Sequence, residues 1–408
     1  MGLGARHGPR LQRPLRIFGF ATEPRSPGEA RIAVRVAAQP GLLQDLRART
    51  PAMLDALRAL VEAESPTADA DACLACANVA DELAYGLVGV RAQRLESGGR
   101  AHLLWRFGHR QRILLVGHLD TVWPVGTLAR WPFTVRDGRA SGPGAFDMKA
   151  GVVQLLFALA ALDSCDGIAV LLTTDEETGS PTARPLIEAT AAGIEAALVL
   201  EPSARGALKT ERKGVALYRI EVRGRAAHAG LDPEKGANAA VEIAHQLIAI
   251  AALARPDAGT HVTPSLVAGG TAVNTVPAHA SAQVDVRART AAEAERVASG
   301  LAALRPVLTG TVLEVERSVS IPPLERAASA ALFARAQRVA GGLGLPELTE
   351  AAVGGGSDGS VLAAVGVPVL DGLGAVGDHA HAEGEYVEID SLAERAALVA
   401  ALVKDLSA

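Results

Sequence analysis

Short segments far apart in this sequence end in residue types that bind metal ions, and most of them follow a strand-like run of apolar residues. Continuous apolar runs, such as those at residues 113–116, 168–173 and 197–200, are typical of strands covered on both faces, as in a parallel sheet. Ligands bind at the carboxyl ends of such strands. The pattern therefore predicts a doubly wound, mostly parallel-sheet α/β domain with a metal site at one edge. The ligand-type residues are His118, Asp147, Glu176, Glu177, Glu201 and His381.

The α/β rhythm is interrupted in the second half of the chain, where the order becomes strand, helix, two strands, helix, strand. The predicted strands and helices are, in order, 214–223, 236–254, 261–267, 280–287, 291–304 and 311–317. This βαββαβ order describes a small ferredoxin-like α+β sandwich. We therefore expect a catalytic domain formed by residues 43–212 and 319–408, with an inserted lid and dimerisation domain at 213–318.

Composition excludes several classes of protein. The net charge of −5, without a basic stripe and interleaved aromatic residues, argues against a nucleic-acid partner. No apolar run is long enough to span a membrane, so no membrane partner is expected. Three cysteines favour a reducing, cytoplasmic location, and the pair Cys73 and Cys76 is interpreted as core packing rather than as a redox or zinc pair. Residues 1–42, rich in Arg, Gly and Pro, lack a secretory signal and are expected to form a disordered extension.

The ligand-type residues lie in contexts that suit metal chemistry, although each also has an ordinary structural explanation. Asp120 follows His118 by two residues, so both side chains point the same way and the carboxylate can orient the imidazole. Asp147 lies in a glycine-rich turn, where it either caps a helix or bridges two cations. Glu176 and Glu177 directly follow a strand, so one can bind metal while the other accepts a proton from bound water. A solvated acidic loop is the alternative.

Two later segments are ambiguous when the residues are considered alone. His379 and His381 are both candidates for the second histidine ligand. The glycine-rich segment at 354–359 can cradle a phosphate through its backbone amides, but it lacks the lysine of a P-loop and the spacing of a dinucleotide motif. A substrate-facing loop of the catalytic cleft is the favoured interpretation of that segment.

Taken in order, four segments resemble the di-zinc metallopeptidase family of bacterial glutamate carboxypeptidase, aminoacylase, acetylornithine deacetylase, succinyl-diaminopimelate desuccinylase and peptidase T. They are GHLDTV (117–122), GPGAFDMKAG (142–151), TDEETGS (174–180) and EPS (201–203). The resemblance extends over nearly everything after about residue 43. It implies two zinc ions per subunit, replaceable by cobalt or manganese, and a cis peptide bond between Asp147 and Met148.

The resemblance also implies a role for each residue type. His118 and Glu201 would bind one zinc ion, and Glu177 would bind the other together with a late histidine. Asp147 would bridge the two ions. In the family this histidine is followed by three residues and then a Glu before an aromatic residue, a spacing that fits His381. The remaining catalytic roles fall to Glu176 as the general base and Asp120 as the partner of the His118 ring.

The inserted domain resembles the dimerisation domain of that family, which implies a homodimer. Its segment GRAAHAG (224–230) matches the motif whose histidine, here His228, reaches into the partner subunit's site to stabilise an oxyanion. Asn274 and Arg287 match substrate-contacting positions, and an arginine fork is suited to a free carboxylate. The alternative for His228 is an ordinary surface histidine, and the alternative for Asn274 and Arg287 is that both are routine strand-end residues. The loop positions expected to face the substrate are Gly355, Gly356 and Ser357.

The expected function is hydrolysis of the amide bond before a C-terminal amino acid, with Glu176 activating a water held between the two ions. The turn after Trp123 resembles the glutamate carboxypeptidase branch. An N-acyl-amino-acid deacylase is the first alternative, because its substrate also ends in a free carboxylate. A non-catalytic binding protein with the same fold is a more distant one. The substrate class is thus a small peptide or an N-acyl amino acid.

Overall fold

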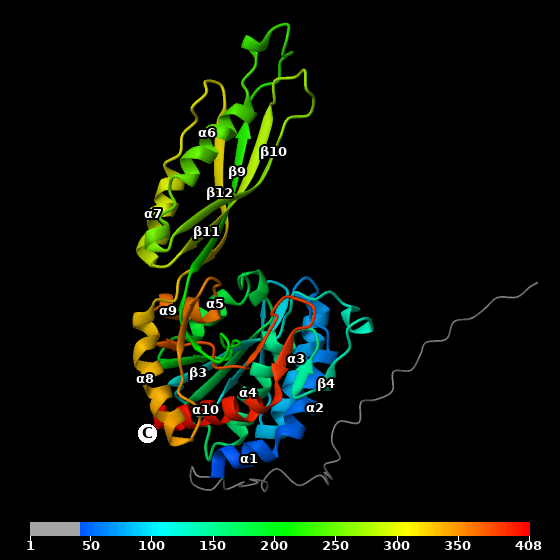
Figure 1. The fold of residues 1–408 in the computed structure, drawn as a ribbon, viewed down its shortest axis with the longest axis vertical. Coiled ribbons are helices and arrows are strands. Elements are labelled where there is room, and N and C mark those ends of the chain that lie inside the picture. Colours follow the sequence, from blue (N-terminus) through cyan, green and yellow to red (C-terminus); the bar gives the residue numbers. More distant parts are fainter. Residues whose placement is uncertain (1–40) are drawn as a thin grey trace, which may run out of the picture. The chain divides into compact units, whose positions relative to one another are not determined.

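A six-stranded mixed sheet forms the centre of the larger part of the molecule (Figure 1). The computed structural model describes residues 41–408, so the predicted extension lies outside the described residues except for its last two, of which Leu42 begins helix α1 (Leu42–Ala48). Four strands of the sheet run parallel and two antiparallel strands extend one edge, which confirms the expected mostly parallel α/β architecture. In sheet order the strands are β1 (Gln93–Ser97), β2 (Arg100–Arg106), β6 (Ile168–Thr173), β3 (Ile113–His118), β7 (Ala196–Val199) and β14 (Val369–Leu370).

Helices cover both faces of this sheet, which explains why every residue of its four parallel strands β6, β3, β7 and β14 is buried. On β3, Ile113 and Leu115 pack into one core cluster and Leu114 and Val116 into another, as expected for side chains that alternate between faces. Each such buried side chain contributes about 1.5–3 kcal/mol to folding. One face packs on α2 (Thr50–Glu62), α3 (Ala70–Val88), α4 (Ala150–Ala160), α8 (Arg326–Gly342) and α10 (Ile389–Ser407), the other on α5 (Arg184–Thr190) and α9 (Asp358–Ala364).

The structure adds short strands that the sequence pattern did not indicate and corrects the start of the first strand. The apolar pattern at residues 90–95 predicts a strand, but β1 begins only at Gln93, because α3 continues to Val88 and Gly89 ends it with a left-handed φ of 73°. Strands of two to five residues are too short to show a period. The unpredicted ones form a four-stranded sheet, β15 (Gly377–Asp378), β16 (Tyr386–Glu388), β5 (Arg139–Ser141) and β4 (Thr134–Arg136), and the parallel pair β8 (Leu208–Arg212) and β13 (Glu350–Val353).

The inserted region is a four-stranded antiparallel sheet with two helices on one face, and we call it the lid. Its order β10-β11-β9-β12, with one helix after β9 and one after β11, confirms the ferredoxin-like prediction. The last strand continues to Ile321, beyond the expected 317, because a bulge between Arg317 and Val319 restores its pairing with β9. The elements are β9 (Gly214–Arg223), α6 (Ala239–Ala251), β10 (His261–Gly269), β11 (His279–Ala288), α7 (Ala291–Ala302) and β12 (Val312–Ile321).

The predicted core role of the two spaced cysteines is confirmed. Cys73 and Cys76 are buried in α3, and the Sγ of Cys73 lies 3.3 Å from the backbone oxygen of Pro66. Burial raises the pKa of the Cys73 thiol to about 12, so this side chain is an unreactive thiol at neutral pH. Among the helices of residues 41–408, none combines the length and the apolar character that crossing a membrane requires.

Candidate metal centre and active site

Ligand-type side chains from five distant segments meet at the carboxyl edge of the parallel strands. His118 is the last residue of β3, and its ring is buried. Its Nε2 lies 3.3 Å from Oδ1 of Asp147 and 3.4 Å from Oε1 of Glu201, which follows β7 by two residues. Two strand ends and the turn that carries Asp147 therefore bring an imidazole and two carboxylates to one point.

A second imidazole completes the arrangement on the other side of Asp147. The Nε2 of His381 lies 3.3 Å from Oδ2 of Asp147 and 3.0 Å from Oε2 of Glu177. The two oxygens of Asp147 thus face two different histidines. His379, the alternative from the sequence, instead places its ring edge-on against Tyr386 at a centroid distance of 6.0 Å.

The donor atoms suit divalent cations. Two groups of three side chains have ligand atoms within 4.8 Å of one another, and His118 belongs to both. Imidazole nitrogen and carboxylate oxygen are the ligands that zinc takes in catalytic sites. The two groups are His118, Glu176 and Glu201, and His118, Asp147 and Glu177.

Local backbone geometry holds Asp147 in place. It lies in a distorted helical turn at Ala145–Lys149, and the Asp147–Met148 peptide bond is cis, as the resemblance implies. The buried ammonium of Lys149 donates to the backbone oxygens of Leu60 and Ala63, at 2.8 and 3.0 Å, and so ties this turn to the end of α2. Gly151 must lack a side chain, because a Cβ there would lie 2.0 Å from the backbone oxygen of Leu200.

Asp120 holds the glutamate loop rather than the histidine ring. The His118 Nδ1 lies 3.0 Å from the backbone oxygen of Asp120 but 3.6 Å from its carboxylate, so the expected carboxylate–imidazole hydrogen bond is replaced by one to the main chain. The buried carboxylate instead accepts the backbone N–H groups of Glu176 and Glu177, each at 3.2 Å, and the Thr67 hydroxyl at 2.7 Å. The i to i+2 spacing places Asp120 beside His118, but the backbone N–H groups in the loop after β6 are the donors that its carboxylate binds.

The two adjacent glutamates differ in their surroundings. Glu177 contacts His381, whereas the contacts available to the Glu176 carboxylate are with the ligand-type residues around His118. Burial, reinforced by the nearby negative charge of Glu201, raises the pKa of Glu176 well above its ordinary value. A carboxylate with a raised pKa is a stronger base, as proton transfer near neutral pH requires.

Arg212, which the sequence did not single out, is a central buried contact of the site. At the end of β8, its guanidinium donates to both oxygens of Asp371, at 2.7 and 3.0 Å, and to Oε2 of Glu201 at 2.9 Å. Burial acts to raise the pKa of Glu201, but the Arg212 charge outweighs it and holds the pKa at about 2. An arginine ending a short charged strand predicts only an exposed residue, so no sequence signal marked it.

The predicted glycine loop is fixed by the same arginine. Arg212 donates to the backbone oxygens of Gly355 and Gly356, at 3.2 and 2.9 Å, and the Ser357 hydroxyl donates to Asp371 at 2.7 Å. The loop oxygens are therefore turned toward a protein cation. The loop lies beside the residue that contacts Glu201, which places it at the edge of the site.

The predicted site residues of the lid lie in two places, with His228 and Asn274 in one and Arg287 in the other. His228 and Asn274 lie on adjoining segments, because the backbone oxygen of Asn274 accepts the N–H of Ala229 at 2.9 Å. The Nδ1 of His228 accepts two backbone N–H groups at 3.1 Å, so in the neutral ring Nε2 carries the proton. Arg287 is bound by both oxygens of Asp285 at 2.8 Å and also donates to the Gly354 oxygen at 3.2 Å.

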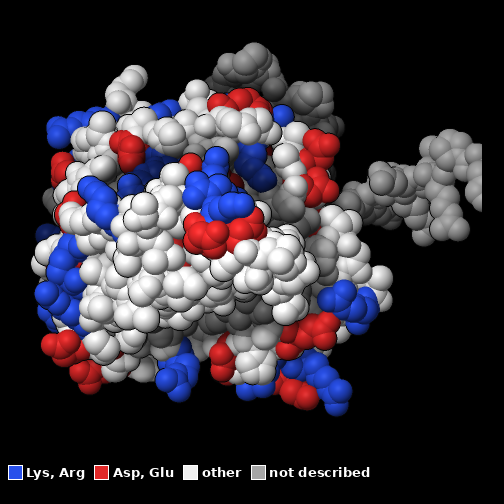
Figure 2. All heavy atoms as spheres, turned by 90° about the horizontal axis from the view of Figure 1, so that it is seen from above, with Lys and Arg blue, Asp and Glu red and all other residues white. Residues whose placement is uncertain are grey.

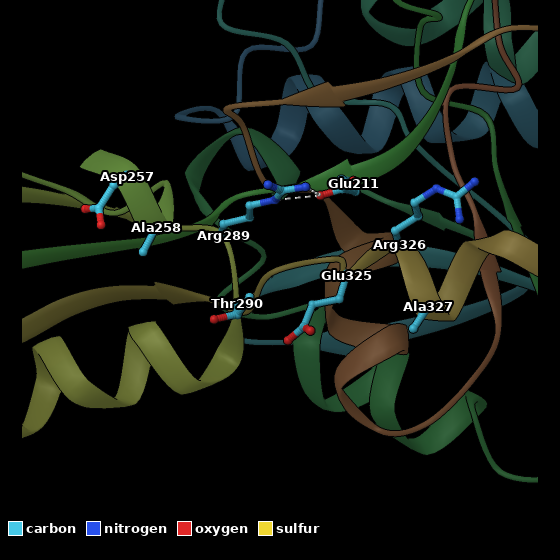
Figure 3. A pocket seen from close by; sticks show the side chains of 8 residues that line it. All are labelled: Glu211, Asp257, Ala258, Arg289, Thr290, Glu325, Arg326 and Ala327. Atoms are coloured by element: carbon cyan, nitrogen blue, oxygen red, sulfur yellow. Dashed lines mark hydrogen bonds and ion pairs between the residues drawn. The ribbon is translucent and has the colours of Figure 1, made fainter. Parts of the chain in front are cut away.

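A pocket of about 430 Å³ lies elsewhere and contains none of the predicted site residues (Figure 3). Its cationic groups are already neutralised, because Arg289 pairs with Glu211 at 2.9 Å and Arg326 pairs with Glu350 at 2.9 Å. The pocket is thus distinct from the cluster of ligand-type side chains around His118 and Asp147.

Comparisons with known proteins identify the family of the chain. A model of peptidase family M20/M25/M40 matches residues 114–405. The chain belongs to this family. Carboxypeptidase G2 from Pseudomonas sp. (strain RS-16) is 30% identical over 387 residues, 90% of this chain and 92% of that protein. Succinyl-diaminopimelate desuccinylase from Thioalkalivibrio sulfidiphilus is 28% identical over 381 residues, 86% of this chain and 98% of that protein.

Among solved structures, aminopeptidase PepT from Bacillus cereus has the same fold, with a TM-score of 0.68 and 24% identity over 88% of this chain and 99% of that one. As an M20-type peptidase, the chain is a hydrolytic enzyme that acts on amide bonds. Enzymes of the family depend on metal, and the two ligand groups around His118 are the candidate binding residues.

Metal binding by this M20-family enzyme is expected to release protons. The His381 ring donates hydrogen bonds to the Asp147 and Glu177 carboxylates, which raises its pKa to about 10, so the ring is protonated at neutral pH, whereas a metal ligand must be neutral. Zinc affinity should therefore increase from about pH 6 to about pH 9, and calorimetry in two buffers of different ionisation enthalpy should show proton release. His381→Gln should reduce the release and His379→Gln should not. An affinity that is constant over this range would contradict the expectation.

Proposed function

We propose that this chain is a zinc-dependent exopeptidase that hydrolyses the amide bond before a C-terminal amino acid. The observation that carries the proposal is the position of Asp147, with one oxygen toward His118 and the other toward His381. A carboxylate shared between two imidazoles is the arrangement that two bridged cations require. The similarity to carboxypeptidase G2 over 90% of the chain supports the reaction class.

In this proposal the ligand-type residues divide into two sets that share one bridge. His118 and Glu201 would hold one zinc ion, and His381 and Glu177 would hold the other. Asp147 belongs to both sets. When bound, the ions polarise the scissile carbonyl and stabilise the negative charge that develops on its oxygen. Arg212 keeps Glu201 ionised and oriented, because it fixes one oxygen of that carboxylate at 2.9 Å.

Glu176 has the role of proton carrier. Its backbone is fixed by Asp120, and the ligand-type histidine His381 is contacted by the neighbouring Glu177. It accepts a proton from the attacking water and delivers it to the leaving amine. The raised pKa of Glu176 suits both halves of this transfer, since the protonated form must persist until the amine leaves.

The lid is proposed to supply the rest of the site from a second copy of the chain. The neutral tautomer of His228 presents Nε2–H, which can donate to a carbonyl oxygen as it becomes negative. Apolar side chains exposed on the lid, including Leu231 (80%) and Ile248 (73%), support a homodimer through this domain. On the face drawn in Figure 2, a broad uncharged area lies beside a cluster in which acidic and basic side chains lie next to one another.

The substrate carboxylate is assigned to Arg287 and the loop residues Gly355, Gly356 and Ser357, whereas Asn274, which adjoins the His228 segment, is assigned to the part of the site that the second copy supplies. Arg287 already binds a carboxylate, that of Asp285, through two of its nitrogens. Its Nη1 turns toward the glycine loop at Gly354. We propose that the substrate carboxylate is held at this side of the guanidinium, while Asp285 keeps the fork in place.

A screen of purified protein tests the proposal. Peptides and N-acyl amino acids with a free carboxylate should be hydrolysed in the presence of zinc, and the same compounds with an amidated C-terminus should not. The ratio of kcat/KM for peptidyl over N-acyl substrates decides between the exopeptidase and the deacylase, which the desuccinylase relative favours as the second candidate. Absence of hydrolysis of every such compound by zinc-loaded protein would contradict the proposed function.

A further inference from the structure

The loop that carries His381 ends in a buried carboxylate that the proposed mechanism does not use. Glu385 precedes β16 and has no solvent exposure. Its Oε1 accepts the backbone N–H groups of Phe146 and Asp147, at 2.7 and 2.9 Å. Its Oε2 accepts the backbone N–H of Gly144 at 3.2 Å and the indole N–H of Trp123 at 3.0 Å. Burying a charge is costly unless it is fully hydrogen-bonded, and these donors supply that requirement.

The donors come from the two segments whose positions matter for the metal centre. One of these donors is the backbone N–H of Asp147 itself, so the Glu385 carboxylate restrains the backbone of the proposed bridging residue. The other segment is the turn that begins after Asp120 and includes Trp123. The backbone of Glu385 is restrained in turn, because the Ser141 hydroxyl donates to its oxygen at 2.7 Å and β16 pairs with β5.

We propose that Glu385 is a positioning residue that sets the spacing between Asp147 and His381, and that Trp123 extends this restraint to the turn beside the site. The inference rests on the proposed two-metal function. It follows from connectivity: His381 and Glu385 belong to the same loop between β15 and β16, and Glu385 is anchored to the turn that carries Asp147. The carboxylate therefore joins the two segments that must approach one ion together.

Glu385→Gln tests the proposal with little change of shape. An amide accepts through one oxygen only and turns an N–H₂ group toward N–H donors that now have no acceptor. We expect zinc affinity, measured by competition with a chromophoric chelator, to decrease about 10–100-fold, and the visible spectrum of the cobalt form to change. Glu383→Gln is the matched control, since Glu383 lies in the same loop but is exposed and pairs with Arg130 at 2.9 Å. It should leave both measurements unchanged.

Trp123→Phe gives a second test that removes a single donor. The ring remains packed against Trp131, whose centroid lies 5.0 Å away, but the hydrogen bond to Glu385 is lost. We expect zinc affinity to decrease about tenfold, because the lost bond had a charged acceptor. Trp131→Phe is the control and should have a clearly smaller effect, since the indole of Trp131 donates to Ser141 and not to the carboxylate.

The outcomes separate this inference from the proposed function. If wild-type protein binds zinc and hydrolyses its substrate while both Glu385→Gln and Trp123→Phe keep wild-type zinc affinity and cobalt spectra, the positioning role is refuted and the function stands. A lowered melting temperature of the metal-free variants with unchanged zinc affinity refutes the positioning role in the same way. If Glu385→Gln does not fold, Trp123→Phe decides. If wild-type protein neither binds zinc nor hydrolyses any substrate, the proposed function fails, and this inference fails with it.

Discussion

Glu176→Gln is expected to lower kcat by about 10²–10⁴-fold while the bound metal remains at the wild-type amount. The amide keeps the size of the side chain but cannot accept the proton of the attacking water. Because Glu177 rather than Glu176 contacts His381, removing the Glu176 charge should leave the second ligand set intact. Steady-state kinetics on a substrate from the screen, together with metal analysis of the purified variant, measure both quantities.

Two matched variants make this expectation specific. Glu177→Gln should lose metal as well as activity, since its carboxylate lies 3.0 Å from Nε2 of His381. Glu188→Gln removes an exposed glutamate that pairs with Arg184 on α5, and it should change neither property. A wild-type kcat in Glu176→Gln would contradict the assignment of Glu176 as the general base. Loss of both activity and metal would show that Glu176 is a metal ligand instead.

Arg212→Met is expected to destabilise the protein by about 3–5 kcal/mol, because it leaves buried carboxylates without their cation. The side chain of Arg212 is 4% exposed, and its partners Asp371 and Glu201 are buried as well. Without the guanidinium, the backbone oxygens of Gly355 and Gly356 also lose their donor. Urea denaturation of the wild type and the variant, followed by circular dichroism, measures the difference in the free energy of unfolding.

An adjacent ion pair provides the control for this measurement. Glu211, the residue before Arg212, pairs with Arg289, and the Arg289 side chain is 58% exposed. Arg289→Met should shift the urea midpoint little, since exposed pairs are screened by water. Equal shifts for the two variants would show that burial of the Arg212 contacts does not determine stability. Arg212→Lys should lie between them, because a single ammonium cannot bind Asp371 through two nitrogens.

Much of the fold could be predicted because it is recorded in local patterns. The strand at 168–173 is predicted and observed with the same bounds, since every side chain in β6 is buried and the apolar run has no gap. The βαββαβ order of the lid is likewise visible, because its helices and strands are long enough to show their periods. The strand pairs β8–β13 and β5–β16 were not predicted, since strands of three to five residues show no period and are formed through partners distant in the sequence.

The sequence by itself determined the class of the protein and the types of its site residues. Apolar runs that end in His, Asp and Glu specify strands and the groups at their ends, and these are local properties. Only the tertiary structure decided which groups share a contact. It directed the Asp120 carboxylate to the backbone of Glu176 and Glu177, placed Arg212 against Glu201, and joined Glu385 to the turn of Asp147. These contacts join residues that are 11 to 238 positions apart, and hydrogen-bond partners at such separations are chosen by packing and not by any pattern along the chain.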